Sequence, residues 1–381
     1  MTGFMLFSSA VLLTHAATLC RWALGWRRAI RQGSPHAATP SEPVFAVVIP
    51  ARNEAASLPH VLDDLAMQKD GPSFRVVVVD DHSVDDTSSV VQSHPLAGAG
   101  RAAVVLNRDE GKKSALLTGI DHVNAPWILA LDADVRLGEH WARSWSRGLA
   151  AKGDDVACVA GPVVLSSRGT QVNWSERIQA LDFAAQMGWS AGQLARNAPG
   201  SASGANLAFR PATYPDTRDL GPSGDDTLVV QALQAQGHAV AWLADPEARV
   251  WTRGATTIAE WVSQRLRWAG KAQHYPWGAL RTALWMGLMA ATQWLLVAGA
   301  LVDMVHASWA VGWWVATTVL NAAYASPVVA WFGIRAPFRD WVLLGFTQPF
   351  QVPVLLLARA GVLRPWGIAS QPTWKGRTCI P

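Results

Sequence analysis

The sequence has little charge and little cysteine. Only 16% of its 381 residues are charged, whereas about a quarter are charged in ordinary soluble domains. The three cysteines, Cys20, Cys158 and Cys379, are widely separated and form no Cys-x-x-Cys pair, which excludes a disulfide framework and a cysteine zinc site. The net charge is only +4 and is not clustered in the middle of the chain, so no nucleic-acid partner is expected.

Long apolar segments and tryptophan are abundant instead. Half of the residues are hydrophobic, and the 21 tryptophans crowd towards the C-terminal third. Tryptophan prefers the boundary between membrane and water. The stretch from Phe4 to about Trp26 matches the roughly 20 residues that span a bilayer. It has no basic residue before it and no clear small-residue cleavage site, which favours a membrane anchor over a cleaved signal peptide.

Three further apolar stretches follow, at 279–302, 307–334 and 338–358. The first two are predicted to be membrane-spanning helices, because a buried helical core rarely has runs this long with so few charges. The third carries Gln348, Pro349, Gln351 and Pro353. These residues favour a broken or re-entrant segment over a clean span.

Basic residues beside these stretches predict the orientation, because they gather on the cytoplasmic side. They are Arg27, Arg28, Arg31, Lys271, Arg281, Arg335 and Arg339. The link around Asp303 and His306 has no Lys or Arg and should face outward. Residues from about 27 to 278 are therefore predicted to lie in the cytoplasm, in a multi-pass protein of the inner membrane. The tail with Arg364, Lys375 and Arg377 would lie inside if the last segment re-enters, and outside if it spans.

The middle of the chain alternates strand and helix patterns. Short apolar, β-branched runs occur at 44–50, 74–80, 102–106 and 127–134, with helical patterns at 54–68, 84–93 and 111–123 between them. A Pro-rich linker precedes the first strand. Such alternation predicts an α/β fold with a doubly wound, mostly parallel sheet, in which ligands bind at the carboxyl ends of the strands.

Acidic and amide side chains follow three of these strands. They are Asn53, Glu54, Asp80, Asp81, Asp132 and Asp134. Carboxylates at one edge of a sheet repel one another unless a cation lies among them. The Asp-x-Asp pair 132/134 suits Mg²⁺ or Mn²⁺, which take oxygen ligands and share them with a diphosphate. A capped turn is the ordinary alternative for one such pair alone.

Three later patterns have both an ordinary and a functional interpretation. Lys112 and Lys113 begin a helix, where basic residues oppose the helix dipole and indicate an anionic ligand, or are simply solvated. Asp225 and Asp226 begin another helix, where acids also serve as caps. Residues 256–275 form an amphipathic helix, rich in Trp and basic residues, that suits a membrane surface.

Together the motifs resemble family 2 glycosyltransferases of the GT-A fold, in the membrane-anchored branch of cellulose, chitin and hyaluronan synthases and smaller bacterial relatives. The resemblance covers about residues 44–275. The matching motifs are PARNEA, VVDDHSVDDT, GKKSAL, DAD, SGANLAFR, GDD and QRLRW, in the family's order. It divides the chain into a membrane anchor (1–31), a linker (32–43), a GT-A domain (44–255), an amphipathic interface helix (256–278), membrane helices (279–360) and a basic tail (361–381).

The resemblance implies a role for each matching residue. Residues implied to bind a donor nucleotide sugar, with UDP expected, are Asn53, Glu54, Asp80, Asp81, Lys112 and Asp132. Asp134, with Asp132, is implied to hold Mg²⁺ or Mn²⁺. Asp226 matches the general base, and Gln264, Arg267 and Trp268 match the QxxRW set that borders acceptor and diphosphate. Ala51 stands where many relatives have Thr, and Asp225 replaces a common Glu, so either Asp225 or Asp226 could be the base.

The expected activity is inverting transfer of sugar to a lipid or saccharide acceptor at the cytoplasmic face, in a protein whose partners include membrane lipids. Two alternatives stay open. One is a processive polysaccharide synthase, favoured by QxxRW but not by the small number of membrane helices. The other is an inactive nucleotide-binding subunit, although such relatives typically lose the DxD or the base. A transporter is disfavoured because no charge constellation lies within the apolar segments.

Overall fold

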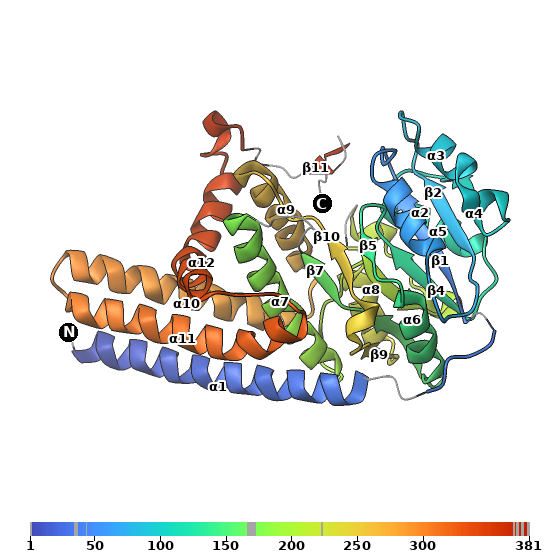
Figure 1. Cartoon of the computed structure of the whole chain (residues 1–381). Helices are drawn as coiled ribbons and strands as arrows, with labels where there is room; N and C mark the ends of the chain where they lie inside the picture. The colour runs from blue at the N-terminus through green and yellow to red at the C-terminus, as the bar shows by residue number, and fades with distance from the viewer. Residues whose placement is uncertain are drawn as a thin grey trace.

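The computed structural model describes residues 2–33, 37–42, 44–165, 173–221, 224–368, 370, 373–374 and 377–378. Cys379 and Lys375 lie outside these residues. Figure 1 shows an α/β domain at one end of the molecule and long helices extending from it to the other end. The chain begins at the far end of these long helices.

The domain is built on a seven-stranded sheet of order β3-β2-β1-β4-β8-β6-β9. Its strands are β1 Phe45–Ala51, β2 Val76–Asp80, β3 Ala102–Leu106, β4 Trp127–Leu131, β6 Val156–Ala160, β8 Asn206–Phe209 and β9 Ala239–Trp242. The first four pair in parallel, and only β8 is antiparallel to its neighbours. The prediction of an α/β fold with a mostly parallel sheet is confirmed.

Short helices connect the strands on both faces. They are α2 Leu58–Ala66, α3 Thr87–Ser93, α4 Pro95–Gly98, α5 Lys112–Asp121, α6 Trp141–Ala150 and α8 Thr227–Ala235. The helices predicted at 54–68 and 84–93 begin later than expected, at Leu58 and Thr87. The reason is that the two segments that precede these helices are hydrogen-bonded to each other. Asn53 Oδ1 accepts from the Val84 N–H at 2.9 Å, and the Glu54 N–H donates to Thr87 Oγ1 at 2.9 Å.

A second sheet of three strands lies beside the first, in the order β5 Arg136–Leu137, β10 Val250–Thr252 and β7 Val163–Leu165. Asn206, on β8 and fully buried, joins the two sheets. Its amide N–H groups donate to the carbonyls of Pro162 and Ala248, and its Oδ1 accepts from the indoles of Trp141 and Trp145. Because every polar atom of the side chain is bonded, this residue of the SGAN motif has a structural role.

Helix α7, Trp174–Leu194, was not predicted, and it connects the domain to the long helices. It packs against α1, Thr2–Gly33, and α11, Ala307–Trp331. At the α1 contact, a Cβ on Gly25 would lie 3.1 Å from Gly192 Cα, so the two helix backbones touch. Asp182, Gln186 and neighbouring residues of α7 are thereby fixed beside the sheet.

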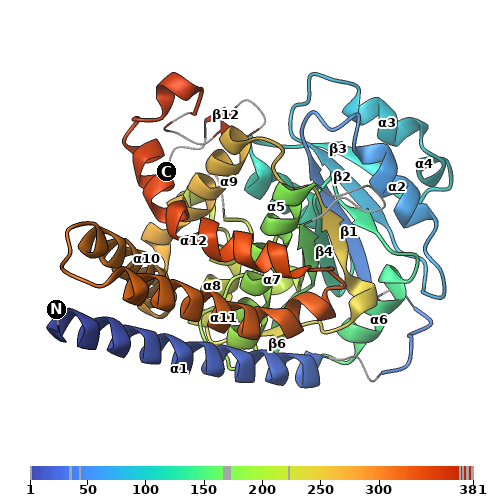
Figure 2. The same cartoon turned by 60° about the vertical axis from the view of Figure 1, so that its left-hand side comes forward.

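Helix α1 extends beyond the apolar stretch from Phe4 to Trp26 into the α/β domain. Its last turns belong to the domain, since Trp26 and Ala29 are buried in the main core and the carbonyl of Gly33 accepts from the Ala244 N–H. The N-terminal helix is therefore continuous from the far end of the bundle into the α/β domain (Figure 2).

In the part of the chain that the structure describes, three helices are long and apolar enough to cross a membrane: α1, α10 Trp277–Leu301 and α12 Phe338–Arg359. Helix α11 is as long as α10 but is not one of these three, so the membrane span predicted at 307–334 is not confirmed. A polar network connects all four helices. His15 is bonded to Asn321 and Trp285, and the Asn321 amide donates to Gln348 Oε1 at 3.0 Å.

Helix α12 is one helix and is not broken, although it contains Pro349 and Pro353. A proline lacks the N–H that would bond the carbonyl four residues before it. The two carbonyls concerned, of Gly345 and Pro349, instead accept the indole N–H groups of Trp314 and Trp294, each at 2.9 Å. Neighbouring helices therefore satisfy the backbone groups that the prolines leave unbonded.

Helix α12 contacts different helices along its length. Its first turn contacts α7 through the buried Asp340, which accepts from Arg177 at 2.7 Å. Its middle packs on α10 and α11, and its last turns pack on α9, Ile258–Gly270. Figure 2 shows its C-terminal part turning away from the bundle towards α9. A short 3₁₀ helix, Lys271–His274, follows α9. In the tail, two strands of two residues each, β11 Thr373–Trp374 and β12 Arg377–Thr378, pair with each other.

Candidate active site

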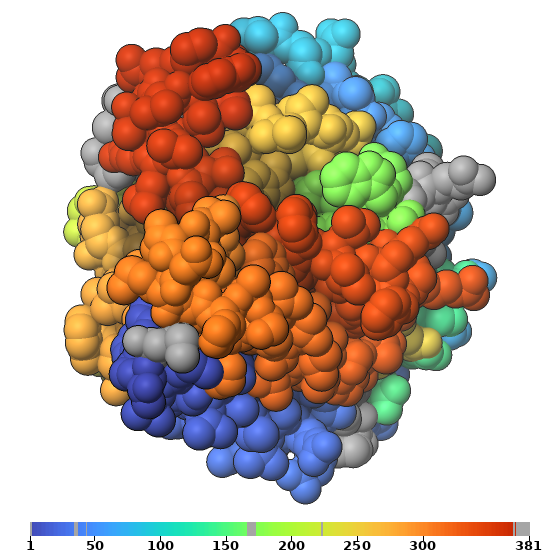
Figure 3. Space-filling model, turned by 90° about the vertical axis from the view of Figure 1, so that its left-hand side faces the viewer, coloured from blue at the N-terminus to red at the C-terminus, as the bar shows by residue number. Residues whose placement is uncertain are grey.

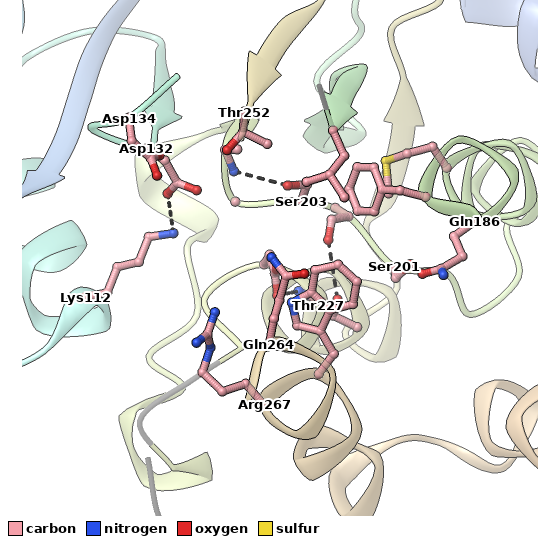
Figure 4. Close-up of a pocket in the computed structure, with 18 of the residues that line it drawn as sticks. Lys112, Asp132, Asp134, Gln186, Ser201, Ser203, Thr227, Thr252, Gln264 and Arg267 are labelled. Atoms are coloured by element: carbon pink, nitrogen blue, oxygen red, sulfur yellow. Dashed lines mark hydrogen bonds and ion pairs between the residues drawn. The ribbon is translucent and has the colours of Figure 1, made fainter. Parts of the chain in front are cut away.

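A cavity of about 350 Å³ lies between the sheet, α7 and α9. Its polar lining comes from segments that are far apart in the sequence: Glu54, Lys112, Asp132, Asp134, Gln186, Ser201, Ser203, Asp226, Thr227, Thr252, Arg253, Gln264, Arg267, Lys271 and Tyr275. Figure 4 shows Asp132, Asp134 and Lys112 on one side of this cavity, facing Gln264 and Arg267 of α9. The acidic residues that follow β1 and β4 therefore lie opposite the QxxRW helix, across the same cavity.

Lys112, the first residue of α5, connects two predicted site residues. Its ammonium group lies 2.6 Å from Asp132 Oδ1 and 2.7 Å from Asp225 Oδ2. Burial alone lowers the pKa of Lys112, but the two carboxylates outweigh it and raise the pKa well above the ordinary value. Lys112 is therefore a fixed positive charge in the cavity, and not a solvated surface lysine.

The loop at 200–205 passes directly over this ion pair. A Cβ at Gly204 would lie 2.5 Å from Asp225 Oδ2 and 3.1 Å from Lys112 Nζ. Only a residue without a side chain allows the backbone to lie so close to both groups. The glycine of the SGAN motif is thus explained by the charges beneath it.

Asp226 both caps a helix and faces the cavity. It is the N-cap of α8, where its carboxylate accepts from the Thr227 N–H, and its Oδ1 lies 2.9 Å from Lys271 Nζ. Burial favours a higher pKa for Asp226, but Lys271 and the Thr227 N–H lower the pKa below its ordinary value. The capping and the functional interpretations of this residue are therefore compatible, and the carboxylate is ionised at neutral pH.

The Asp-x-Asp pair suits a divalent cation only together with a ligand. Asp134 is exposed at the cavity and Asp132 is bonded to Lys112. Among the described residues, no group of three or more His, Cys, Asp or Glu side chains could hold a metal ion. Mg²⁺ and Mn²⁺ commonly bind one or two carboxylates and complete their shell with substrate phosphates and water. The donor set fits that arrangement.

Helix α9 presents Gln264, Arg267 and Trp268 to the cavity, as predicted from QxxRW. The other arginine of QRLRW, Arg265, points elsewhere. It is buried, donates to Asp182 of α7 at 2.7 Å, and lies over the ring of Trp268 at 4.8 Å. Val262 and Leu266 pack against α12. Part of the apolar face predicted to suit a membrane surface is thus covered by α12, whereas Ile258 at the start of α9 is exposed.

Three of the predicted donor-binding residues do not line this cavity: Asn53, Asp80 and Asp81. The Asp80 carboxylate accepts from the Ser83 N–H and from Ser88 Oγ, within its own loop. Asp81 is buried, and its Oδ1 accepts from Asn107 Nδ2 and the Gly111 N–H. Since Gly111 precedes Lys112, Asp81 positions the start of α5, next to the cavity. Lys113 is also structural, because its buried ammonium donates to the Thr217 carbonyl at 2.6 Å.

Sequence reasoning missed Lys271 and Tyr275 as site residues. The helical periodicity of the segment could have found them. Gln264, Trp268, Lys271 and Tyr275 are spaced by 4, 3 and 4 residues, which places them on one face of a helix, and all four line the cavity. Phe183, Gln186 and Met187 of α7 also line it, and no motif indicated them.

Comparison with known proteins fits this geometry. The sequence model described as glycosyl transferase family group 2 matches residues 127–332, which is more than half of the chain. The chain belongs to this family. A second model, glycosyl transferase family 2, matches residues 46–202. The predicted family is confirmed, and the two matched regions together include the sheet, the Asp-x-Asp pair, Asp226 and α9.

The curated relatives are similar over a limited region. The undecaprenyl-phosphate 4-deoxy-4-formamido-L-arabinose transferase of Klebsiella pneumoniae is 37% identical over 94 residues, 24% of this chain and 29% of the relative. The enzyme of the same name from Pseudomonas aeruginosa is 37% identical over 96 residues, 24% and 28% of the two chains. The match thus spans less than a third of the length of these relatives.

Among solved structures, the mannosyltransferase PcManGT from Pyrobaculum calidifontis, in complex with GDP-Man and Mn²⁺, has the same fold. The TM-score is 0.52 at 19% identity, over 92% of this chain and 99% of that one. The likeness includes nearly all of both chains, so the GT-A fold is confirmed together with the long helices at the two ends.

Proposed function

We propose that the protein is a membrane-bound inverting glycosyltransferase that moves a sugar from a nucleotide-diphosphate donor to a lipid acceptor at the cytoplasmic face. One observation carries the proposal. A single cavity contains Asp132, Asp134, Asp226 and the QxxRW side chains, and it lies beside helices long and apolar enough to cross a membrane. Family membership and the lipid-phosphate acceptors named for the relatives support the same activity.

The donor occupies the side of the cavity formed by β1, β4 and α5. Asp132 and Lys112 face the sugar diphosphate, and Asp81, Asn53 and Glu54 lie in the adjoining loops, where a nucleotide base would extend. Asp134 and Asp132 would hold Mg²⁺ or Mn²⁺, which would supply positive charge opposite the diphosphate. The structural neighbour holds a nucleotide sugar and Mn²⁺.

Asp226 is the general base for a hydroxyl acceptor. Its ionised carboxylate takes the hydroxyl proton while the acceptor oxygen forms a bond to the anomeric carbon. The bond from that carbon to the diphosphate breaks, and the diphosphate leaves with the electron pair. Lys112 and Arg267 are the cationic side chains that face this developing charge. Attack opposite the leaving group inverts the anomeric centre.

A phosphate acceptor changes only one of these steps. A phosphate monoester is already anionic near neutral pH, so no proton has to be removed. Asp226 would then orient Lys271 at 2.9 Å instead of acting as a base. The acceptor chemistry therefore decides whether Asp226 acts in proton transfer.

Reconstitution tests the proposal. The full chain in lipid vesicles is incubated with Mn²⁺ or Mg²⁺, one of a panel of UDP- and GDP-sugars, and either polyprenyl phosphate or a glycolipid with a free hydroxyl. Products are identified by mass spectrometry. A lipid carrying one added sugar is expected. A long polymer would establish the processive alternative, and nucleotide binding without any product would establish the inactive subunit.

A further inference from the structure

We infer that a second cavity, between α7, α9 and α12, binds the hydrocarbon chain of the acceptor lipid. This inference rests on the proposed lipid acceptor. The cavity has a volume of about 430 Å³ and is separate from the first. Its apolar side chains come from all three helices: Trp174 and Ile178 from α7, Ile258 and Trp261 from α9, and Phe350 and Val354 from α12.

The bend in α12 accounts for this space. Thr347, Phe350, Gln351 and Val354 line the cavity, and they surround Pro349 and Pro353 in the sequence. The first turn of α12 is held on α7 by Asp340 and Arg177, whereas Ala358 is buried against α9. The helix thus contacts α7 and α9 at its two ends, with the cavity at its middle.

The rim of the cavity is apolar and open. Ile258 is 72% exposed and Trp174 is 59% exposed, on the face where α9, the start of α7 and α12 meet in Figure 3. Exposed Trp and Ile beside a candidate membrane helix are typical of the level where protein meets lipid chains. A hydrocarbon chain could enter there without passing through the α/β domain.

Both cavities share one wall, made by neighbouring residues of the same two helices. On α7, Asp182 lines the second cavity while Phe183 and Gln186 line the first. On α9, Trp261 and Arg265 face the second while Gln264 and Trp268 face the first. This wall contains the pairs Asp182–Arg265, 2.7 Å apart, and Phe183–Trp268, with ring centres 5.7 Å apart.

This arrangement matches an amphipathic acceptor. The head group must reach Asp226 in the polar cavity, and the chain must leave it towards the membrane helices. A cavity directly behind the wall, with a mainly apolar surface and open beside α12, provides that exit. Arg265 adds one polar contact, because its buried Nε has no hydrogen-bond partner among the described residues and lies where the head group and chain join.

Photocrosslinking tests binding without requiring turnover. The full chain in vesicles is exposed to polyprenyl phosphate with a diazirine on its chain, and labelled peptides are mapped by mass spectrometry. Label is expected in residues 174–178 and 347–354, and unlabelled polyprenyl phosphate should compete for it. Label elsewhere on the helices, or equal competition by an ordinary phospholipid, overturns the inference.

Variants that fill the cavity test its use in transfer. Val354→Trp should raise the KM for a long-chain acceptor about tenfold or more, while a short-chain, water-soluble analogue and the nucleotide sugar keep their KM values. Val352→Trp is the matched control, because Val352 lies on the same helix, does not line the cavity and is 37% exposed.

Ser175→Phe, from the opposite wall, repeats the test if Val354→Trp fails to fold. Equal effects on long and short acceptors overturn the inference. Failure of the wild-type protein to glycosylate either acceptor, with the chain still crosslinked in the cavity, would contradict the proposed function but not the lipid site.

Discussion

At the scale of single residues, the site depends on ion pairs that hold carboxylates in place. Lys112 lies between Asp132 and Asp225, and Lys271 lies beside Asp226. These pairs bring together acids from two segments that would otherwise repel one another. Of Asp225 and Asp226, only Asp226 lines the cavity, which is why we propose it as the base.

Asp226→Asn tests the general base. Asn caps a helix almost as well as Asp, so the fold and donor binding should be kept, while transfer to a hydroxyl acceptor slows by about two to four orders of magnitude. Turnover and donor affinity are measured together. Near-normal turnover with a hydroxyl acceptor would mean that Asp226 serves only as a helix cap. Asp225 would then be the next candidate for the general base.

Lys271 should set the pH dependence of the reaction. Because Lys271 keeps the pKa of Asp226 below its ordinary value, the wild-type base stays ionised as the pH falls towards the ordinary carboxyl range. In Lys271→Met the effect of burial dominates and the pKa of Asp226 rises, so the acid limb of kcat/KM moves to higher pH. Lys271→Arg retains the charge and should keep the wild-type profile. Identical profiles for the Met and Arg variants would exclude this role.

Asp134→Ala tests the metal site. The exposed carboxylate follows the buried strand β4, so its removal should abolish transfer and Mn²⁺-dependent donor binding while the protein stays folded and membrane-bound. Asp63→Ala, at an exposed residue on α2, is the control. Full activity of the Asp134 variant, or undiminished wild-type activity in a chelator, contradicts the metal assignment.

At the scale of elements, α7 and α12 determine how the active-site cavity is positioned relative to the long helices. Helix α7 was not predicted from the sequence, and the apolar stretch at 338–358 was predicted to be broken or re-entrant. The α7 segment has no motif, and its helix is stabilised by contacts with α1 and α11. The prolines of α12 indicate an interruption, yet the helix continues because Trp314 and Trp294 bond the two unpaired carbonyls.

Trp314→Phe should therefore destabilise the bundle. The substitution keeps an aromatic ring but removes the N–H that bonds the Gly345 carbonyl. The expected cost is about 1 kcal/mol, seen as a lower thermal midpoint in detergent. Trp277→Phe, at a 65% exposed position of α10, should have little effect. Equal midpoints for the two variants would show that the indole bond contributes nothing.

At the scale of the whole molecule, the basic residues predict that the α/β domain lies in the cytoplasm. In a cysteine-free background, Ala38→Cys should resist an impermeant thiol reagent in intact cells. Met304→Cys, in the exposed link between α10 and α11, should react. The reverse pattern would invert the topology.

The sequence alone predicts the family, the α/β fold and the motif residues that line the cavity, because these depend on local signals. β-branched runs make buried strands, and each catalytic motif is placed where its strand or helix ends. QxxRW also has its side chains at helical spacing.

Only the tertiary structure decided which acids face the cavity. Asp80 and Asp81 look equivalent to Asp132 in sequence, but their oxygens bond to Ser83, Ser88 and Gly111. Likewise Arg265 and Arg267 are two residues apart on α9, and one is buried against α7 while the other lines the reaction cavity. Hydrogen bonds and packing between distant segments fix these differences, and no local pattern records them.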